Sequence, residues 1–233
     1  LLGPEQPFYG LQAQGFDGKL DPHLSVEEMA AHYVELLRGL GSAEPYRLGG
    51  WSFGGLVAYE MARQFRAKRE EVALVALVDS YLTQTRADNW KADKADIYMK
   101  FIRHVGLSGA AFADAAKEFR QLAADRQLSF VLERIMAAEN KYARLGAGRM
   151  RRLYEVFETH LRAAQAYKPG PYAGRVALFA AAEGGGEGAA AGWSALVVGG
   201  LDFHLVPGDH FTLLERPNVE ILAGELRACL QEI

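Results

Sequence analysis

The chain has 233 residues, of which 50% are hydrophobic and 24% charged, a formal net charge of −3 and a single cysteine, Cys229. These values are typical of a globular protein with a sizeable core, and one cysteine excludes a disulfide framework or a multi-cysteine metal site. The slightly acidic charge gives no electrostatic reason to expect nucleic acid or an anionic membrane as a partner. No apolar run approaches the roughly 20 residues of a membrane-spanning helix, and we expect a reducing, cytoplasmic compartment.

Strand and helix patterns alternate over the first eighty residues. They predict a strand, a helix, a strand, a helix and a strand at residues 8–13, 25–40, 46–50, 56–66 and 71–80. Ser25 and Glu28 have the spacing of a capping box at the first helix. The last segment, EVALVALVDS, is an almost unbroken apolar run, as in a strand covered on both faces. This order predicts a parallel sheet with crossover helices.

The alternation stops after Ser80. Residues 88–167 show only helical spacing of apolar positions, followed by a strand at 175–181, a glycine-rich flexible loop at 183–192, a strand at 201–208 and a helix at 216–233. We therefore expect one domain over residues 1–233 of the α/β class: a mostly parallel sheet, helices on both of its faces, and a helical insertion at about residues 82–166.

The stretch Gly50-Trp51-Ser52-Phe53-Gly54 follows a predicted strand and precedes a predicted helix. In that context G-x-S-x-G is a nucleophile elbow, a tight turn that raises the serine hydroxyl above the end of the sheet. The glycines let strand and helix approach closely. The following helix supplies positive potential at its N-terminus, so the backbone N–H of Phe53 is placed to stabilise a developing oxyanion. Ser52 is the predicted nucleophile.

A nucleophilic serine needs a base, and six histidines are available: His23, His32, His104, His160, His204 and His210. His210 lies directly after the last predicted strand, where this architecture delivers its histidine, and the order serine, acid, histidine is kept. His204 lies inside that strand, a position typical of a core or face residue. We predict His210 as the base.

Two acids end predicted strands on the side where the elbow emerges, Asp79 and Glu183. Glu183 runs into the glycine-rich segment, whereas Asp79 ends a buried strand next to that of the elbow. An orienting acid must be held firmly, which favours Asp79. Asp209, beside His210 in sequence, is interpreted as a turn former.

At this point the sequence resembles the chain-terminating thioesterase domains of modular polyketide synthases and nonribosomal peptide synthetases, members of the α/β-hydrolase superfamily. The resemblance covers both ends of the chain and is faint in the insertion. In that family the acid follows the strand after the elbow, which corresponds to Asp79, and the insertion is a lid over the acyl chamber. The stretches that carry it are PFYGLQAQGFDG, PYRLGGWSFGGLVAYEMARQ, VALVDS, YKPGPYAGRVALF and VPGDHFTLLERPNVEILA.

The resemblance also implies a missing part. The family's first strand, and the glycine-containing loop that supplies the second oxyanion N–H, lie upstream of residue 1, so we expect that donor outside this sequence. The chain opens with Leu1 rather than methionine, and we expect it to be the C-terminal domain of a longer polypeptide whose upstream carrier-protein domain is the partner.

The implied reaction is release of an acyl or peptidyl chain from the phosphopantetheine thioester of a carrier protein, through an acyl-Ser52 intermediate, by hydrolysis or macrocyclisation. No cofactor and no metal are expected on the chain itself. Three alternatives stay open: a stand-alone editing thioesterase, a generic esterase or lipase, and a noncatalytic protein of hydrolase fold that only binds acyl groups or carrier proteins.

Overall fold

The computed structural model describes residues 1–41, 45–82, 94–105, 115, 117–137, 142–183 and 186–232. The chain divides into two compact units. We call residues 1–11, 24–88 and 163–233 the sheet unit, and residues 12–23 and 89–162 the helical unit. Each unit is described by itself.

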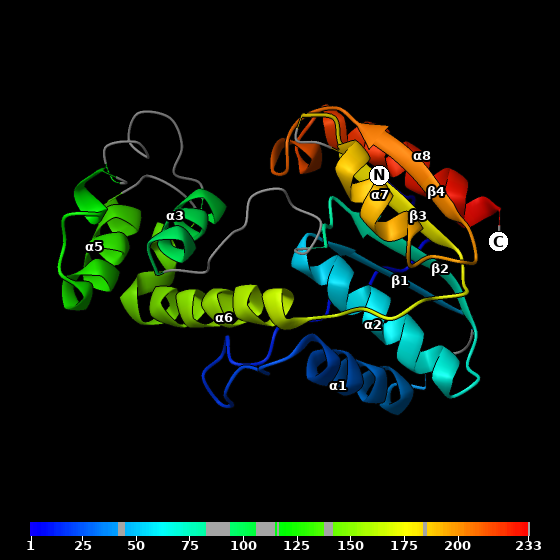
Figure 1. Ribbon diagram of the computed structural model, residues 1–233, viewed down its shortest axis with the longest axis horizontal. Coiled ribbons are helices and arrows are strands. Elements are labelled where there is room, and N and C mark those ends of the chain that lie inside the picture. The colour runs from blue at the N-terminus through cyan, green and yellow to red at the C-terminus, as the bar shows by residue number, and fades with distance from the viewer. Residues whose placement is uncertain are drawn as a thin grey trace. The chain divides into compact units, whose positions relative to one another are not determined.

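A parallel four-stranded sheet forms the centre of the sheet unit (Figure 1). Its strands lie in chain order, β1 (Tyr46–Trp51), β2 (Val72–Val78), β3 (Val176–Ala181) and β4 (Leu201–Val206). Trp51 pairs with Val78, Val78 with Phe179, and Phe179 with His204, so one row of paired residues crosses the sheet near its carboxyl edge. The parallel sheet expected from the sequence is confirmed.

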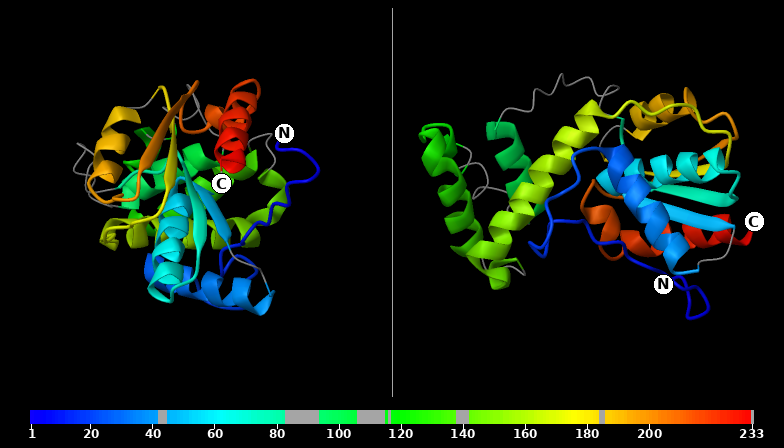
Figure 2. Two further views of the ribbon diagram at one scale, coloured as in Figure 1. Left: turned by 90° about the vertical axis from the view of Figure 1, so that its right-hand side faces the viewer. Right: turned by 90° about the horizontal axis from the view of Figure 1, so that it is seen from below.

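Helices cover both faces of this sheet, as predicted (Figure 2). They are α1 (Val26–Gly39), α2 (Phe53–Ala67), α7 (Gly186–Ser194), the short η3 (Thr212–Leu214) and α8 (Asn218–Gln231). The sheet has one apolar core on each face, and alternate residues of β2 point into each. Val75 and Leu77 pack with α1, α2 and α7, whereas Leu74 and Ala76 pack with η3 and α8. Burial on both faces explains the unbroken apolar run of this strand.

The first helix begins at a capping residue found by sequence. The backbone N–H of Glu28 donates to the Ser25 hydroxyl at 3.1 Å. The Glu28 carboxylate accepts from the N–H of Leu24 at 3.0 Å, one residue earlier than a capping box requires. Half of the predicted box is therefore present, and the second half is displaced by one residue.

The segment that leads into β3 is tied to α2. The Tyr167 hydroxyl donates to the buried carboxylate of Glu60 at 2.8 Å, and the Tyr59 hydroxyl donates to the backbone oxygen of Gly170 at 3.0 Å. Glu60 also accepts from Arg63 at 2.6 Å. Because a buried charge is tolerated only when it is paired and hydrogen-bonded, this cluster fixes residues 167–170 against the helix that follows the elbow.

Two local predictions were wrong. Residues 8–13 form no strand, and Phe8 and Tyr9 are 80% and 78% exposed; an extended segment is stable only with a neighbouring strand. The expected flexible loop at 183–192 contains α7, while residues 184 and 185 lie outside the described residues. Alanines favour a helix there, and the fully buried Trp193 anchors it in the core.

The helical unit is built around an aromatic core. Its described elements are α3 (Lys94–His104), α5 (Ala124–Ala137), η2 (Ala143–Leu145) and α6 (Gly146–Ala166), the last of which ends in the sheet unit. Every element described between residues 94 and 166 is helical, as predicted. Phe101, Phe119 and Tyr154 lie in its core. The rings of Tyr98 and Tyr154 stack with their centroids 4.7 Å apart.

Candidate active site

Ser52 lies on the turn between β1 and α2, at φ 55° and ψ −121°. A positive φ in a residue other than glycine is strained and occurs where surrounding structure holds it. A Cβ at Gly50 would overlap the backbone of Gly54, and a Cβ at Gly55 would overlap the Ser80 hydroxyl. Glycine is thus required on both sides of the turn because the strand and the following helix approach closely there.

Hydrogen bonds fix the backbone of Ser52 from both sides. Its N–H donates to the carbonyl of Val78 at 2.8 Å, and its carbonyl accepts from the Ser80 hydroxyl at 2.7 Å. The carbonyl of Ser80 in turn accepts from the indole N–H of Trp193 at 2.8 Å. Phe53, whose N–H was predicted as an oxyanion donor, is the first residue of α2 and so lies at the positive end of that helix.

Asp79 directly follows β2, and its side chain is only 2% exposed. Its carboxylate accepts from His210 Nδ1 at 2.6 Å, from the N–H of Ala181 at 2.8 Å and from the Tyr81 hydroxyl at 2.9 Å. Burial alone would raise the pKa of Asp79, but these three hydrogen bonds outweigh it and hold the pKa below its usual value. Asp79 is therefore ionised and firmly oriented.

His210 follows β4 in a tight loop, and its Nδ1 faces Asp79. An ionised carboxylate only accepts hydrogen bonds, so Nδ1 carries the proton and Nε2 is the basic nitrogen. The Asp209 side chain accepts from the N–H groups of Phe211 and Thr212 at 3.0 and 2.9 Å. This confirms Asp209 as a turn former, and it rigidifies the loop that presents His210.

The structure brings Asp79, rather than Glu183, to the imidazole of His210. Glu183 lies in the turn after β3, where it is exposed and its backbone N–H donates to the carbonyl of Gly208 at 3.0 Å. It therefore stabilises the histidine loop through its main chain. The rigidity argument made from the sequence selects the acid that contacts His210.

The other histidines lie elsewhere. His204, in β4, bonds through Nδ1 to Glu225 at 3.0 Å, approaches the Cys229 thiol with Nε2 at 3.5 Å, and stacks on Phe179. His32 lies on α1 beside Tyr33. His23, His104 and His160 belong to the helical unit.

Sequence reasoning missed three side chains that contact the elbow, the acid and the histidine: Ser80, Tyr81 and Trp51 respectively. Ser80 and Tyr81 follow Asp79 in the stretch VDSY, so their adjacency to the acid was an available signal. Trp51 precedes Ser52, and its indole N–H donates to the carbonyl of His210 at 3.0 Å. Nothing in the sequence indicates that contact, which joins residues 159 positions apart.

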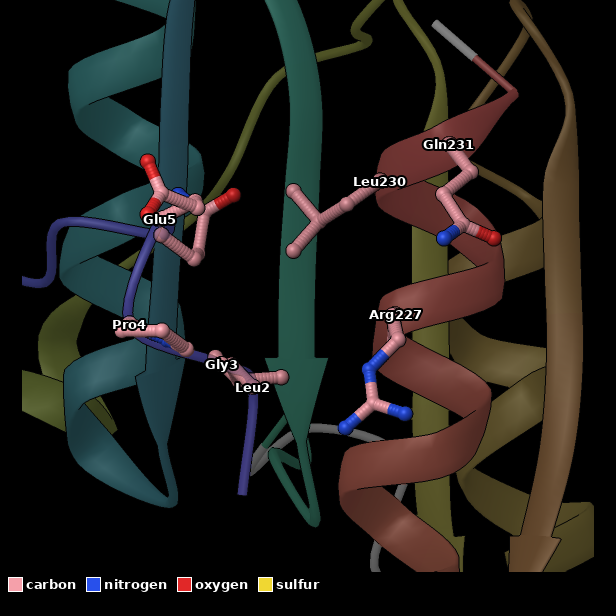
Figure 3. A pocket seen from close by; sticks show the side chains of 8 residues that line it. Leu2, Gly3, Pro4, Glu5, Arg227, Leu230 and Gln231 are labelled. Carbon is pink, nitrogen blue, oxygen red and sulfur yellow. The ribbon is translucent and has the colours of Figure 1, made fainter.

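A surface pocket of about 340 Å³ lies apart from these residues. Figure 3 shows that the N-terminal segment around Leu2 and Pro4 forms one side and that Arg227, Leu230 and Gln231 of α8 form the other. Its eight lining residues include no nucleophile paired with a base. Across the described parts of the chain, no three His, Cys, Asp or Glu side chains are grouped to hold a metal ion, and no helix is long and apolar enough to cross a membrane.

The fold and the elbow define a hydrolase of the α/β-hydrolase superfamily. A sequence model of the family "Thioesterase domain" matches residues 2–230. The chain belongs to the thioesterase domain family and is related to the terminal thioesterase domains of nonribosomal peptide synthetases and polyketide synthases.

Curated relatives of the chain are much longer proteins. Malpibaldin synthetase of Mortierella alpina is 42% identical over 108 residues, which cover 46% of this chain and 2% of that protein. Polyketide synthase PksR of Bacillus subtilis is 31% identical over 130 residues, covering 55% of this chain and 5% of that protein. The chain thus spans a few per cent of the length of these relatives.

Solved structures show the same fold. One is a four-domain nonribosomal peptide synthetase in its holo form, with AMP and glycine bound. The alignment covers 94% of this chain and 17% of the synthetase chain, with a TM-score of 0.79 and 27% sequence identity. The NocB thioesterase domain was solved in covalent complex with a fluorophosphonate nocardicin G analogue. The alignment covers 94% of this chain and 81% of the NocB chain, with a TM-score of 0.64 and 26% sequence identity.

Proposed function

We propose that this chain releases an acyl or peptidyl group from the phosphopantetheine thioester of a carrier protein, by acyl transfer to Ser52. The observation that carries the proposal is the hydrogen bond of 2.6 Å from His210 to the buried, ionised Asp79, beside a serine held at positive φ on a nucleophile elbow. A serine, an imidazole and an orienting carboxylate supply the nucleophile, the base and the fixed tautomer that acyl transfer needs.

In the first half of the reaction, His210 Nε2 takes the proton of the Ser52 hydroxyl as its oxygen attacks the thioester carbonyl. Asp79 keeps Nδ1 protonated and stabilises the imidazolium. The carbonyl oxygen becomes an oxyanion near the N-terminus of α2, where the N–H of Phe53 stabilises it. When the tetrahedral intermediate collapses, the carbon–sulfur bond breaks, the thiolate takes the proton from His210, and the acyl group stays on Ser52.

In the second half, the acyl-Ser52 ester is cleaved by a second nucleophile. His210 removes a proton from water, which yields a free acid, or from a hydroxyl or amine of the bound chain, which yields a ring. The proton then returns to Ser52. Both routes use the same three residues, and access of water to the acyl group decides between them.

The proposed partner is a carrier-protein domain in the same polypeptide. Support comes from the relatives: the chain aligns with a small part of much longer synthetases, and one similar solved structure is a four-domain nonribosomal peptide synthetase. The helical unit is proposed to act as the lid of the acyl chamber, as the family resemblance implies.

Intact-mass spectrometry tests the proposal. The chain is incubated with a serine-reactive fluorophosphonate and, separately, with long-chain acyl-pantetheine thioesters, alongside Ser52→Ala. An adduct that maps to Ser52 and is absent from Ser52→Ala is expected with both reagents. Faster turnover of the thioester than of the matching oxygen ester is expected for a thioesterase and not for a generic esterase. A wild-type chain that forms no adduct on Ser52 with either reagent contradicts the proposal.

A further inference from the structure

Trp51 contacts His210 in two independent ways. Its indole N–H donates to the backbone carbonyl of His210 at 3.0 Å, and its ring stacks on the imidazole with centroids 4.8 Å apart and planes 26° apart. The residue next to Trp51 in the chain is Ser52. The side chain that holds the proposed base therefore belongs to the residue that precedes the proposed nucleophile.

The indole is itself held in place. Trp51 is the last residue of β1, pairs with Val78 in β2, and packs against the core beneath α8. Its ring also meets the edge of Phe211 at 6.1 Å. An aromatic side chain fixed by a strand on one side and by a loop on the other cannot tilt freely, so the histidine loop is positioned relative to the sheet.

The imidazole of His210 is thus constrained in two directions. Asp79 holds Nδ1 within the plane of the ring, at 2.6 Å. Trp51 lies against one face of the ring, and Phe211 meets it at an angle of 82°. Charged residues at this loop include Asp79, which faces the ring, and Asp209, whose carboxylate accepts from the backbone of Phe211 and Thr212. Glu183 also lies there, and its backbone N–H donates to the carbonyl of Gly208.

We propose that Trp51 is a positioning residue for His210, holding the histidine loop through its indole N–H and stabilising the imidazolium through its ring face. This rests on the proposed function, in which the Ser52 proton moves to Nε2 and His210 becomes a cation. The face of an indole carries negative charge density and attracts a cation within about 6 Å. The attraction exists only while the proton is on the ring, so it favours the transferred state over the resting state.

The proposal predicts that loss of the indole face and loss of the indole N–H have different effects. The indole face attracts only the protonated ring, so its loss disfavours proton transfer to His210. The rate of Ser52 labelling by a fluorophosphonate, measured against pH, rises as His210 becomes neutral. In Trp51→Leu we expect the midpoint of that rise about 0.5 to 1 pH unit lower, and a plateau roughly 5- to 30-fold lower.

Trp51→Phe separates the two contacts, since it keeps an aromatic face and removes the N–H. We expect its midpoint to stay closer to wild type than that of Trp51→Leu, and its plateau to fall about 5-fold from loss of one hydrogen bond. Phe203→Leu, which removes a partly exposed aromatic residue of β4, is the matched control. Its midpoint and plateau are expected to equal those of wild type.

The experiment labels each variant with the fluorophosphonate over a range of pH and maps the adduct by mass spectrometry. The pKa of His210 is also measured in each variant from its imidazole Hε1 resonance, which requires no labelling. If circular dichroism shows that Trp51→Leu does not fold, Trp51→Met takes its place with the same expectation.

The role of Trp51 alone would be overturned by one result. The wild-type chain forms the adduct on Ser52, but folded Trp51→Leu or Trp51→Met shows labelling and Hε1 midpoints at the same pH as wild type, or higher. A wild-type chain that forms no adduct on Ser52 would overturn the proposed function instead. The Hε1 measurements would in that case still decide whether the indole face favours the protonated imidazole.

Discussion

The two units of the chain keep their side chains in place by different means. In the sheet unit, polar atoms of the site are fixed by directed hydrogen bonds: Ser52 through Val78 and Ser80, and Asp79 through three donors. In the helical unit, α3, α5 and α6 are joined by a cluster of apolar and aromatic side chains, with stacked and edge-on ring contacts.

This difference predicts how strongly a substitution in each unit should affect the geometry of the site. A hydrogen bond fails when a single atom moves by a fraction of an ångström, whereas apolar packing tolerates changes that keep volume and patterning. Reactive geometry is thus concentrated where the backbone is constrained. We expect chemistry to depend on the sheet unit, and substitutions in the core of the helical unit to act mainly on stability.

The largest expected effect separates Asp79, the proposed orienting acid, from Glu183, the other acid that the sequence offers. Asp79→Asn keeps the shape of the site but favours the wrong tautomer of His210, so turnover of an acyl-pantetheine thioester should fall about 10⁴-fold. Glu183→Gln is the matched control and should stay within about 3-fold of wild type. A larger loss in Glu183→Gln than in Asp79→Asn would reverse the assignment of the acid.

A cavity in the helical unit should affect stability without affecting the nucleophile. Phe101 is fully buried, and its ring lies 5.3 Å from those of Tyr154 and Phe157. Phe101→Ala should lower the free energy of unfolding in urea by about 3–5 kcal/mol, while the small fluorophosphonate still labels Ser52. The exposed Met136 of α5, changed to alanine, should cost less than about 1 kcal/mol. Equal losses in both variants would contradict this division of roles.

Acid should destabilise the protein through His160 of the helical unit. Burial, with a smaller contribution from His23, lowers the pKa of His160 from 6.5 to about 4. As the pH falls, the imidazole of His160 binds a proton in the unfolded chain before it does so in the folded protein. The free energy of unfolding is therefore highest above pH 6.5 and falls as the pH drops toward 4, by roughly 3 kcal/mol in total. Urea unfolding at pH 7, 5.5 and 4.5 measures this loss, which should be smaller by that amount in His160→Gln. The same pH dependence in both proteins would exclude His160 as its source.

The smallest expected effect tests the close approach at the elbow. Gly50→Ala would place a Cβ against the backbone of Gly54, and overpacking of this kind costs about 1–3 kcal/mol. Gly54→Ala places its Cβ where nothing lies within 4 Å, so it should be tolerated. Thermal unfolding and Ser52 labelling compare the two variants. Equal behaviour of the pair would show that the turn relaxes easily.

Much of the fold could be predicted from the sequence because burial leaves a pattern in it. The apolar run 71–80 predicted β2, and the spacing of apolar residues predicted α1, α2 and α8. Residues 8–13 have the composition of a strand, but composition does not reveal whether a neighbouring strand pairs with them. The segment containing α7 was misinterpreted because its glycines outweighed the alanines and the anchoring Trp193.

For the site, the sequence pointed to positions rather than to contacts. The elbow motif and chain order predicted Ser52 and His210 as nucleophile and base, and rigidity favoured Asp79 over Glu183 as the acid. The contact between Trp51 and His210 depends on how an indole at the end of one strand meets a loop at the end of another. Such a contact follows from side-chain orientation in the folded sheet, which no local pattern encodes.

The end of α6 has a consequence for exchanging parts between related thioesterase domains. The boundary between the two units falls within this helix, between Arg162 and Ala163. Ala163, Ala164 and Tyr167 are buried in the core of the sheet unit, and Tyr167 is bonded to Glu60. A chimera that imports a foreign helical unit should therefore be joined before Ala163, so that the last turn of α6 and its tyrosine stay with the host sheet.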